Sequence, residues 1–196
     1  MLTFEFFQRI LKFTTFLLFL DQISHAQSHA KLSSYQIQFL NEFRNAYYNL
    51  YLEENIPKLE LSLEKIGQPE QKAMRAMLAY TIFSLNSGSE LEEQTTKDFH
   101  LLSDEATPRL KNKISSNSED QISKLRLGLI YGLIGSVELA YKKNYFQAYR
   151  YGSTGISILD EVFAKDPQLA DAQLSRGIMK IMIAQSEWYI RWFAPI

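Results

Sequence analysis

The stretch that decides the fold is LRLGLIYGLIGSVELAYKKNYFQAYRYGSTGISILDEVFAKDPQLADAQLSRGIMKIM, residues 125–182. Apolar residues recur at helical spacing over 125–142 and again over 145–165, and a polar Lys-Asn pair separates the two runs. An Asp-Pro pair at 166–167 ends the second run, and a third helix is expected to begin near Leu169. This stretch therefore predicts a helical hairpin followed by the first half of another.

Glycines inside the hairpin predict that its two helices pack very close together. Gly128, Gly132 and Gly135 are four and three residues apart, so they share one face of the first helix. Each glycine inside a helix costs roughly 1 kcal/mol relative to alanine, so three on one face indicate a compensating close contact. Gly152 and Gly155 are expected to do the same from the second helix.

A membrane-dimerising glycine face is the rival interpretation of these residues. The apolar run of residues 127–140 has only fourteen residues and includes Glu138, whereas a membrane-spanning helix needs about twenty. We therefore expect close packing between helices of a globular domain and no membrane span at this position.

The rest of the chain also has the pattern of helices, so the expected fold is all-α. Helices are expected over residues 32–55, 70–86 and 90–114, and a short helix is expected to begin at Pro57, which suits a first helical turn. The chain has only eight glycines and five prolines, which favours helices over a turn-rich β fold.

Polar residues and one proline suggest where these helices begin and break. Ser33 or Ser34 can cap the first helix, and Ser118 can cap the helix that opens the hairpin. Pro108 is expected to kink the helix around it or to begin a new one.

Residues 1–26 have the pattern of a secretory signal peptide, with two basic residues before a short apolar core at 13–20. Cleavage is expected after Ala26, with Ala30 as the alternative position. The mature protein is then expected in the periplasm, with no integral membrane span. The alternative is an uncleaved leader that anchors the protein in the inner membrane.

Composition limits the chemistry that the chain can perform. There is no cysteine, which excludes disulfides, thiol nucleophiles and cysteine-bound zinc or iron–sulfur clusters. The net charge of −1 gives no sign of nucleic-acid binding. Of the three histidines, only His100 lies well inside the expected fold, so no second histidine is placed to share a metal. We therefore predict a protein that is not an enzyme, with no catalytic residue, cofactor or metal site.

The residues around the hairpin turn resemble a tetratricopeptide repeat. The letters NYFQA, DP and ADA, all within residues 144–172, carry the resemblance. In that family an aromatic residue follows the turn, an alanine three residues later lets two helices touch, and a proline opens the next repeat. Tyr145, Ala148 and Pro167 match these roles, and Gly177 matches the small residue of the next first helix.

The resemblance implies that residues 31–196 form antiparallel helical hairpins stacked as an α-solenoid. Two features depart from the family: the second helix is about two turns too long for the usual repeat, and Gly135-Ser136 stand where the family has Leu-Gly. The implied function is non-enzymatic protein–protein interaction, as an adaptor or scaffold of the bacterial cell envelope. The alternative is a small-ligand-binding accessory component of a periplasmic transport system.

Repeats of this family bind a partner in a groove lined by their first helices, which here implies an apolar and aromatic groove. Leu133, Val137 and Tyr141 are expected to face that groove, with ordinary core contact as the alternative.

The end of the chain supplies further candidates for partner binding. Its large aromatic residues are Trp188, Tyr189, Trp192 and Phe193, and no polar helix follows to cover them. We expect that a protein partner or self-association through residues 187–196 covers them, or that the domain is incomplete at this end relative to its relatives. The alternative is a tail folded onto its own core.

Overall fold

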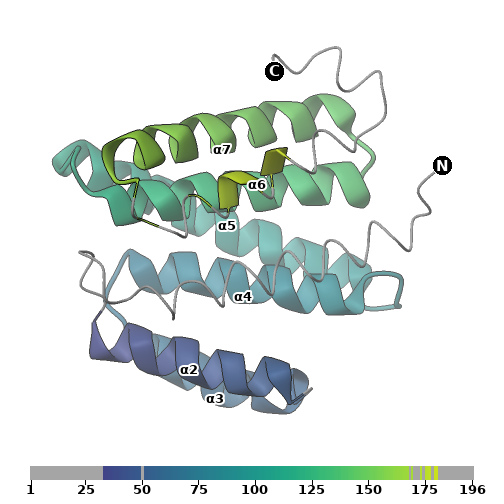
Figure 1. The fold of residues 1–196 in the computed structure, drawn as a ribbon. Helices are drawn as coiled ribbons and strands as arrows, with labels where there is room; N and C mark the ends of the chain where they lie inside the picture. The colour runs from purple at the N-terminus through teal and green to yellow at the C-terminus, as the bar shows by residue number, and fades with distance from the viewer. Residues whose placement is uncertain are drawn as a thin grey trace. The chain divides into compact units, whose positions relative to one another are not determined.

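The structure is a computed structural model that describes residues 33–49, 51–167, 169, 173, 175–177 and 179–180. These residues form the helices in Figure 1: α2 (Ser34–Tyr48), α3 (Leu52–Glu64), α4 (Glu70–Asn86), α5 (Glu92–Ser116), α6 (Gln121–Ala140) and α7 (Tyr145–Lys165). No strand occurs among the described residues, which confirms the all-α prediction. None of these helices combines the length and the apolar character that crossing a membrane requires.

The chain divides into two compact units, Met1–Leu110 and Lys111–Ile196, each of which is considered by itself. In the first unit, α2 begins with a capping box. The Ser33 hydroxyl accepts a hydrogen bond from the Gln36 N–H at 3.2 Å, and the Gln36 side-chain oxygen accepts one from the Ser33 N–H at 2.7 Å. The first of the two predicted caps is therefore confirmed.

A single helix over residues 32–55 is a wrong prediction, because the chain leaves α2 at Asn49 and α3 begins at Leu52. The Tyr51 N–H donates to the Ala46 carbonyl oxygen at 2.9 Å, a bond to the fifth residue back that closes a turn instead of continuing the helix. Leu52 is buried, so the new helix starts with an apolar anchor.

Pro57, expected in a first helical turn, and Pro108, expected to kink a helix or to begin a new one, both lie inside helices. Pro57 is well inside α3 rather than in its first turn, and α5 runs through Pro108 without a new helix beginning there. Each missing N–H costs its helix a hydrogen bond, and burial around the proline offsets that cost. Leu52 and Leu59 are buried on the two sides of Pro57, and Leu110 is buried just after Pro108.

Large apolar side chains form the core of the first unit. Where α2 packs against α3, the buried side chains include Phe39, Phe43, Leu59 and Leu63. Tyr80 of α4 meets Phe99 of α5 edge to face, with their ring centroids 5.4 Å apart. The bounds of α4 match the predicted helix over residues 70–86, and both of its predicted apolar faces contain buried residues.

The second unit begins at the end of α5 and continues into α6. Ser118 is a wrong prediction for the cap of α6, because the cap is Asp120. The Asp120 carboxylate accepts hydrogen bonds from the N–H and from the hydroxyl of Ser123, both at 2.9 Å. Helix α6 therefore begins at Gln121, before the predicted start at 125.

The turn between α6 and α7 lies where the sequence predicts it. Lys143 has a φ of 52°, the left-handed conformation that lets the chain reverse. The Asn144 side-chain oxygen then caps α7 by accepting a hydrogen bond from the Gln147 N–H at 3.3 Å. The bounds of α7 match the predicted helix over residues 145–165.

Close packing of α6 against α7 at glycine residues is confirmed. A methyl group added at Gly135 would lie 3.0 Å from the Ala148 carbonyl oxygen and 3.0 Å from the Gly152 nitrogen. One added at Gly155 would lie 2.8 Å from the Gly128 carbonyl oxygen. Gly152 differs, because a methyl group there would meet nothing within 4 Å. The two backbones touch, and most of the glycines make that possible.

The described residues beyond Pro167 include the helical positions 175–177 and 179–180. Gly132 on α6 faces the side chain of Met179, so a third helical segment covers α6 at a glycine. Arg176 forms an ion pair with Asp160 of α7. This arrangement agrees with the third helix that the sequence predicts.

Candidate functional site

The residues predicted to line a groove do not form an exposed surface. Leu133 and Val137 on α6 are 4% and 0% exposed, and Tyr141, which ends α6, is half-buried. The burial of Leu133 and Val137 agrees with the alternative interpretation, in which they make ordinary core contacts. The remaining predicted residues, namely Ala26, Trp188, Tyr189, Trp192 and Phe193, lie outside the residues that the structure describes.

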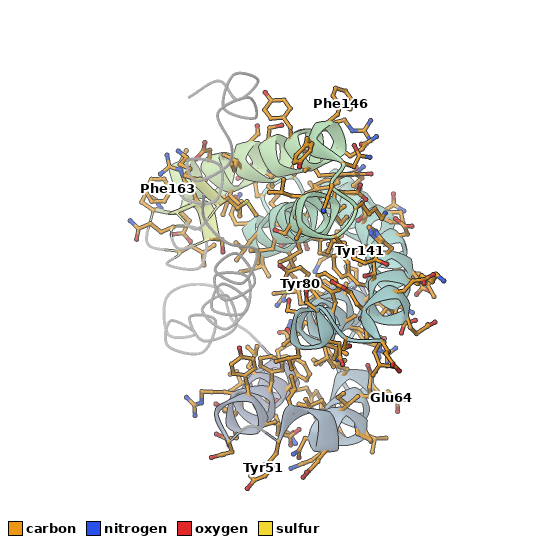
Figure 2. The ribbon with its side chains drawn as sticks, turned by 90° about the vertical axis from the view of Figure 1, so that its right-hand side faces the viewer. Tyr51, Glu64, Tyr80, Tyr141, Phe146 and Phe163 are labelled. Carbon is orange, nitrogen blue, oxygen red and sulfur yellow. The ribbon has the colours of Figure 1, made fainter. Side chains whose placement is uncertain are left out.

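The most exposed aromatic side chain that the structure describes lies instead at the start of α7. Phe146 is 72% exposed and projects outward from the helix, and its neighbour Tyr145 is 40% exposed (Figure 2). Arg150 and Thr154 are also exposed and follow the four-residue spacing that places them on the same face as Phe146, and Lys143 is exposed in the turn before α7. The turn and the start of α7 therefore present a cation, an aromatic ring and a second cation in sequence order.

Two tyrosines beside this face are stacked on each other and covered by cations. The rings of Tyr131 on α6 and Tyr151 on α7 have centroids 6.0 Å apart and an interplanar angle of 24°. Lys111 lies over the Tyr131 ring at 5.6 Å, and the Arg150 guanidinium lies over the Tyr151 ring at 5.2 Å. Cation–π contacts at exposed positions contribute roughly 0.5–1 kcal/mol each, enough to favour one orientation of a long side chain.

We call this region the cationic–aromatic surface, and it consists of Lys111, Tyr131, Lys143, Phe146, Arg150 and Tyr151. It draws residues from the end of α5, from α6, from the turn between α6 and α7, and from the first turns of α7. All of them belong to the second compact unit.

Carboxylates are absent from the chain around this surface and are engaged at its borders. No acidic residue occurs in residues 139–159. At one border the Glu138 side chain is only 7% exposed and pairs with Lys142 at 2.8 Å. At the other border Asp160 pairs with Arg176 and lies 3.7 Å from Lys180. The surface therefore carries the cations Lys111, Lys143 and Arg150, and the acidic residues that border residues 139–159 in the chain pair with other cations.

Ion pairs connect the C-terminal end of α7 to α6 and to the residues just before α6. Lys165 forms an ion pair with Glu119 at 2.7 Å, and Lys124 pairs with Glu161. The hydrogen bond from Lys165, followed by its charge, lowers the pKa of the Glu119 carboxyl, and the same hydrogen bond raises the pKa of Lys165. These opposite shifts favour the charged form of both groups. The pair links the C-terminal end of α7 to Glu119, while the start of the helix carries the exposed residues.

The capping carboxylate of α6 is also held in its charged form. Burial acts to raise the pKa of Asp120, but the hydrogen bonds from Ser123 and the charge of Lys113, 3.3 Å away, outweigh burial. The pKa of Asp120 therefore lies below its ordinary value of 3.8.

Two open clefts among the described residues of the first unit are smaller than the 300–1,000 Å³ typical of small-molecule sites. One, of about 270 Å³, is lined by Glu60, Ala79, Ile82, Thr95, Asp98, Leu101 and Leu102. The other, of about 190 Å³, is lined by Glu42, Asn45, Ala46, Asn49, Tyr51, Asn55, Lys58 and Leu59. Within the described ranges no group of three or more His, Cys, Asp or Glu residues is placed to hold a metal ion. The cationic–aromatic surface is therefore the stronger candidate for a functional site.

The spacing of residues in α7 indicates this surface, whereas the resemblance implies a groove on the preceding helix. Phe146 and Arg150 follow four-residue helical spacing, and Ala148 and Gly155 mark the opposite, packed side of the same helix. Together these spacings would have predicted which side of α7 faces outward.

Comparisons of this chain with protein-family models, with curated proteins and with solved structures find no match.

Proposed function

We propose that the protein is a non-enzymatic interaction module, an adaptor or scaffold of the bacterial cell envelope that binds a segment of a partner protein. The observation that carries this proposal is the cationic–aromatic surface. Phe146 exposes a large apolar side chain between Lys143 and Arg150, so burial of its ring by another molecule would contribute favourable free energy to binding. Aromatic residues and arginine are also the residue types that contribute most to protein–protein interfaces.

The proposed architecture is a tetratricopeptide-like α-solenoid, in which hairpins such as α6–α7 stack on one another. Support comes from Ala148, the residue that in the family lets two helices touch. Its carbonyl oxygen lies 3.0 Å from the position that a methyl group on Gly135 would occupy, so α6 and α7 are in backbone contact near Ala148. Gly132, with the Met179 side chain against it, is consistent with a further helix stacking on α6.

The proposed location is the periplasm, reached with the leader over residues 1–26. Mass spectrometry of the protein recovered from the native envelope would test this proposal. A mature N-terminus at residue 27 or 31 supports export with cleavage. An intact Met1 in the membrane fraction would instead support the anchored alternative.

Co-purification from the native envelope fraction tests the function. Wild-type protein is expected to retain a specific partner, and a K143N/F146S/R150Q variant tests whether the α7 surface holds it. A W188A/W192A variant tests the predicted contribution of the chain end. Recovery of no partner above the background of an unrelated exported protein would contradict the proposed function.

A further inference from the structure

We infer that the cationic–aromatic surface binds an extended acidic segment of the partner, with two carboxylates that flank one apolar side chain. This inference rests on the interaction function proposed above and adds the chemistry of the partner.

The distance between the side chains on this surface determines which positions of an extended partner segment can contact them. From Phe146 to Arg150 the helix rises by about 6 Å, at 1.5 Å per residue, and Lys143 lies in the turn before α7. Along an extended chain, side chains on one face recur about every 6.6 Å, so three alternate positions span about 13 Å. Phe146 and Arg150 therefore match two neighbouring positions on that face, and the long side chain of Lys143 is available to the third. The fitting pattern is therefore an acidic, an apolar and an acidic residue at alternate positions.

The side chains on this surface are arranged to receive carboxylates. The Arg150 guanidinium carbon lies over the Tyr151 ring, 5.2 Å from its centroid. A guanidinium group has several N–H donors and can pair with a carboxylate in a bidentate manner. Because the contact with Tyr151 favours one position of the Arg150 side chain, less side-chain entropy is lost when a carboxylate binds.

Charge complementarity also favours an acidic partner over a basic or neutral one. Residues 139–159 contain no acid, and their cations are Lys143, Arg150 and Lys142, the last of which pairs with Glu138. Lys111 adds a further cation over Tyr131. This concentration of positive charge belongs to a chain whose net charge is −1, so it is a local feature. A local positive field steers acidic segments to this face and repels basic ones.

A membrane surface fits less well than a peptide. Binding of a helix to a bilayer interface buries a continuous apolar face, whereas Phe146 is the one large apolar side chain on the outer face of α7 that is mostly exposed. Two cations over tyrosine rings on the side of the helix hairpin suit a narrow ligand that lies along α7.

Fluorescence anisotropy with the full chain tests the inference. The probe is a fluorescein-labelled Gly/Ser peptide with Glu, Phe and Glu at alternate positions, and its counterpart has Lys in place of each Glu. The wild type is expected to bind the acidic peptide, to bind it more weakly as salt is raised, and to bind the Lys peptide about tenfold less tightly or worse.

The decisive variant is K143N/F146S/R150Q, in which asparagine tolerates the left-handed backbone at position 143. It is expected to bind the acidic peptide about tenfold less tightly or worse. The matched control is K97Q/L101S, which removes an exposed cation and an exposed apolar side chain from α5 and is expected to bind like the wild type. Circular dichroism spectra and melting temperatures show that both variants are folded.

Three results would overturn the inference. They are no binding of the acidic peptide by the wild type, equal binding by wild type and K143N/F146S/R150Q, or binding only to phosphatidylglycerol vesicles in a co-sedimentation assay. A partner that co-purifies equally with wild type and with this variant would overturn the inference and leave the proposed function standing. Failure of the wild type to retain any partner would overturn the function, whatever the peptide result.

Discussion

The α2–α3 pair and the α6–α7 hairpin are both formed by consecutive helices that pack together, but different atoms make the contact. Phe39 and Phe43 of α2 and Leu63 of α3 are buried, so large side chains fill the first interface. In the second interface the backbone at Gly155 approaches the backbone at Gly128. The first interface is therefore sensitive to the removal of atoms, and the second to the addition of a single methyl group.

Removal of a ring from the first interface is expected to have the largest effect. Phe43→Ala deletes a buried aromatic side chain and leaves a cavity, so the free energy of unfolding should fall by about 3–5 kcal/mol. Urea denaturation followed by circular dichroism measures this change. Leu61→Ala on α3 removes an exposed side chain and serves as the control, with an expected change within about 0.5 kcal/mol. Equal effects of the two substitutions would show that side-chain packing does not hold α2 to α3.

Addition of a methyl group to the second interface tests the other half of the comparison. In Gly155→Ala the new Cβ would lie 2.8 Å from a carbonyl oxygen of α6, so the helices must separate. We expect the free energy of unfolding to fall by about 1–3 kcal/mol, despite the better helix propensity of alanine.

Gly152→Ala is the matched control for that experiment, since its methyl group enters open space. Alanine should then raise the free energy of unfolding by up to about 1 kcal/mol through its helix propensity. The same urea titration should give changes of opposite sign in the free energy of unfolding for Gly155→Ala and Gly152→Ala. A stabilising Gly155→Ala would contradict the backbone contact.

The cap of α6 is expected to have a smaller effect. Asp120→Ala removes the acceptor for the Ser123 N–H, so the free energy of unfolding at pH 7 should fall by about 1 kcal/mol. Asp120→Asn keeps an acceptor and should cost less. A loss as large for asparagine as for alanine would show that charge, not capping, is what matters at this position.

The pH dependence of the same variant has a defined sign. The pKa of Asp120 is lowered in the folded chain, so its contribution is fully present above the ordinary value of 3.8 and is lost as pH falls through the lower folded value. The difference in unfolding free energy between wild type and Asp120→Ala should therefore shrink below about pH 4. If the difference between the unfolding free energies of wild type and Asp120→Ala grew as the pH fell, the lowered pKa of Asp120 would be contradicted.

The smallest expected effect is that of the exposed ion pair at the base of α7. Lys165→Gln removes the partner of Glu119, and both groups are on the surface, where solvent and salt screen the interaction. Melting temperatures should differ slightly at low salt and agree at high salt. A large difference that persists at high salt would place this pair among the main supports of the hairpin.

Local patterns predicted the regular parts of the fold. The bounds of α4 and α7 agree with the predicted ones, and the glycine spacing predicted the close approach of α6 and α7. These features depend on neighbours a few residues apart, which sequence periodicity reports directly.

The positions at which helices end depend on which side chains are buried, and local sequence patterns report burial poorly. Pro57 and Pro108 lie inside helices because buried leucines beside them offset a missing hydrogen bond. The break at Asn49 occurs where a bond from Tyr51 to Ala46 closes a turn without a glycine. In the candidate site, the buried Leu133 looked like a groove residue for the same reason, since sequence alone does not report which apolar side chains another helix covers.

The open space beside Gly152 has a practical use. The chain contains no cysteine, so Gly152→Cys would introduce its one thiol at a position where an added side-chain atom meets no neighbour. A spin label or a fluorophore attached there would lie next in sequence to Tyr151 and two residues from Arg150. Such a label would report on the arrival of a ligand at the cationic–aromatic surface without disturbing the backbone contact that holds the hairpin together.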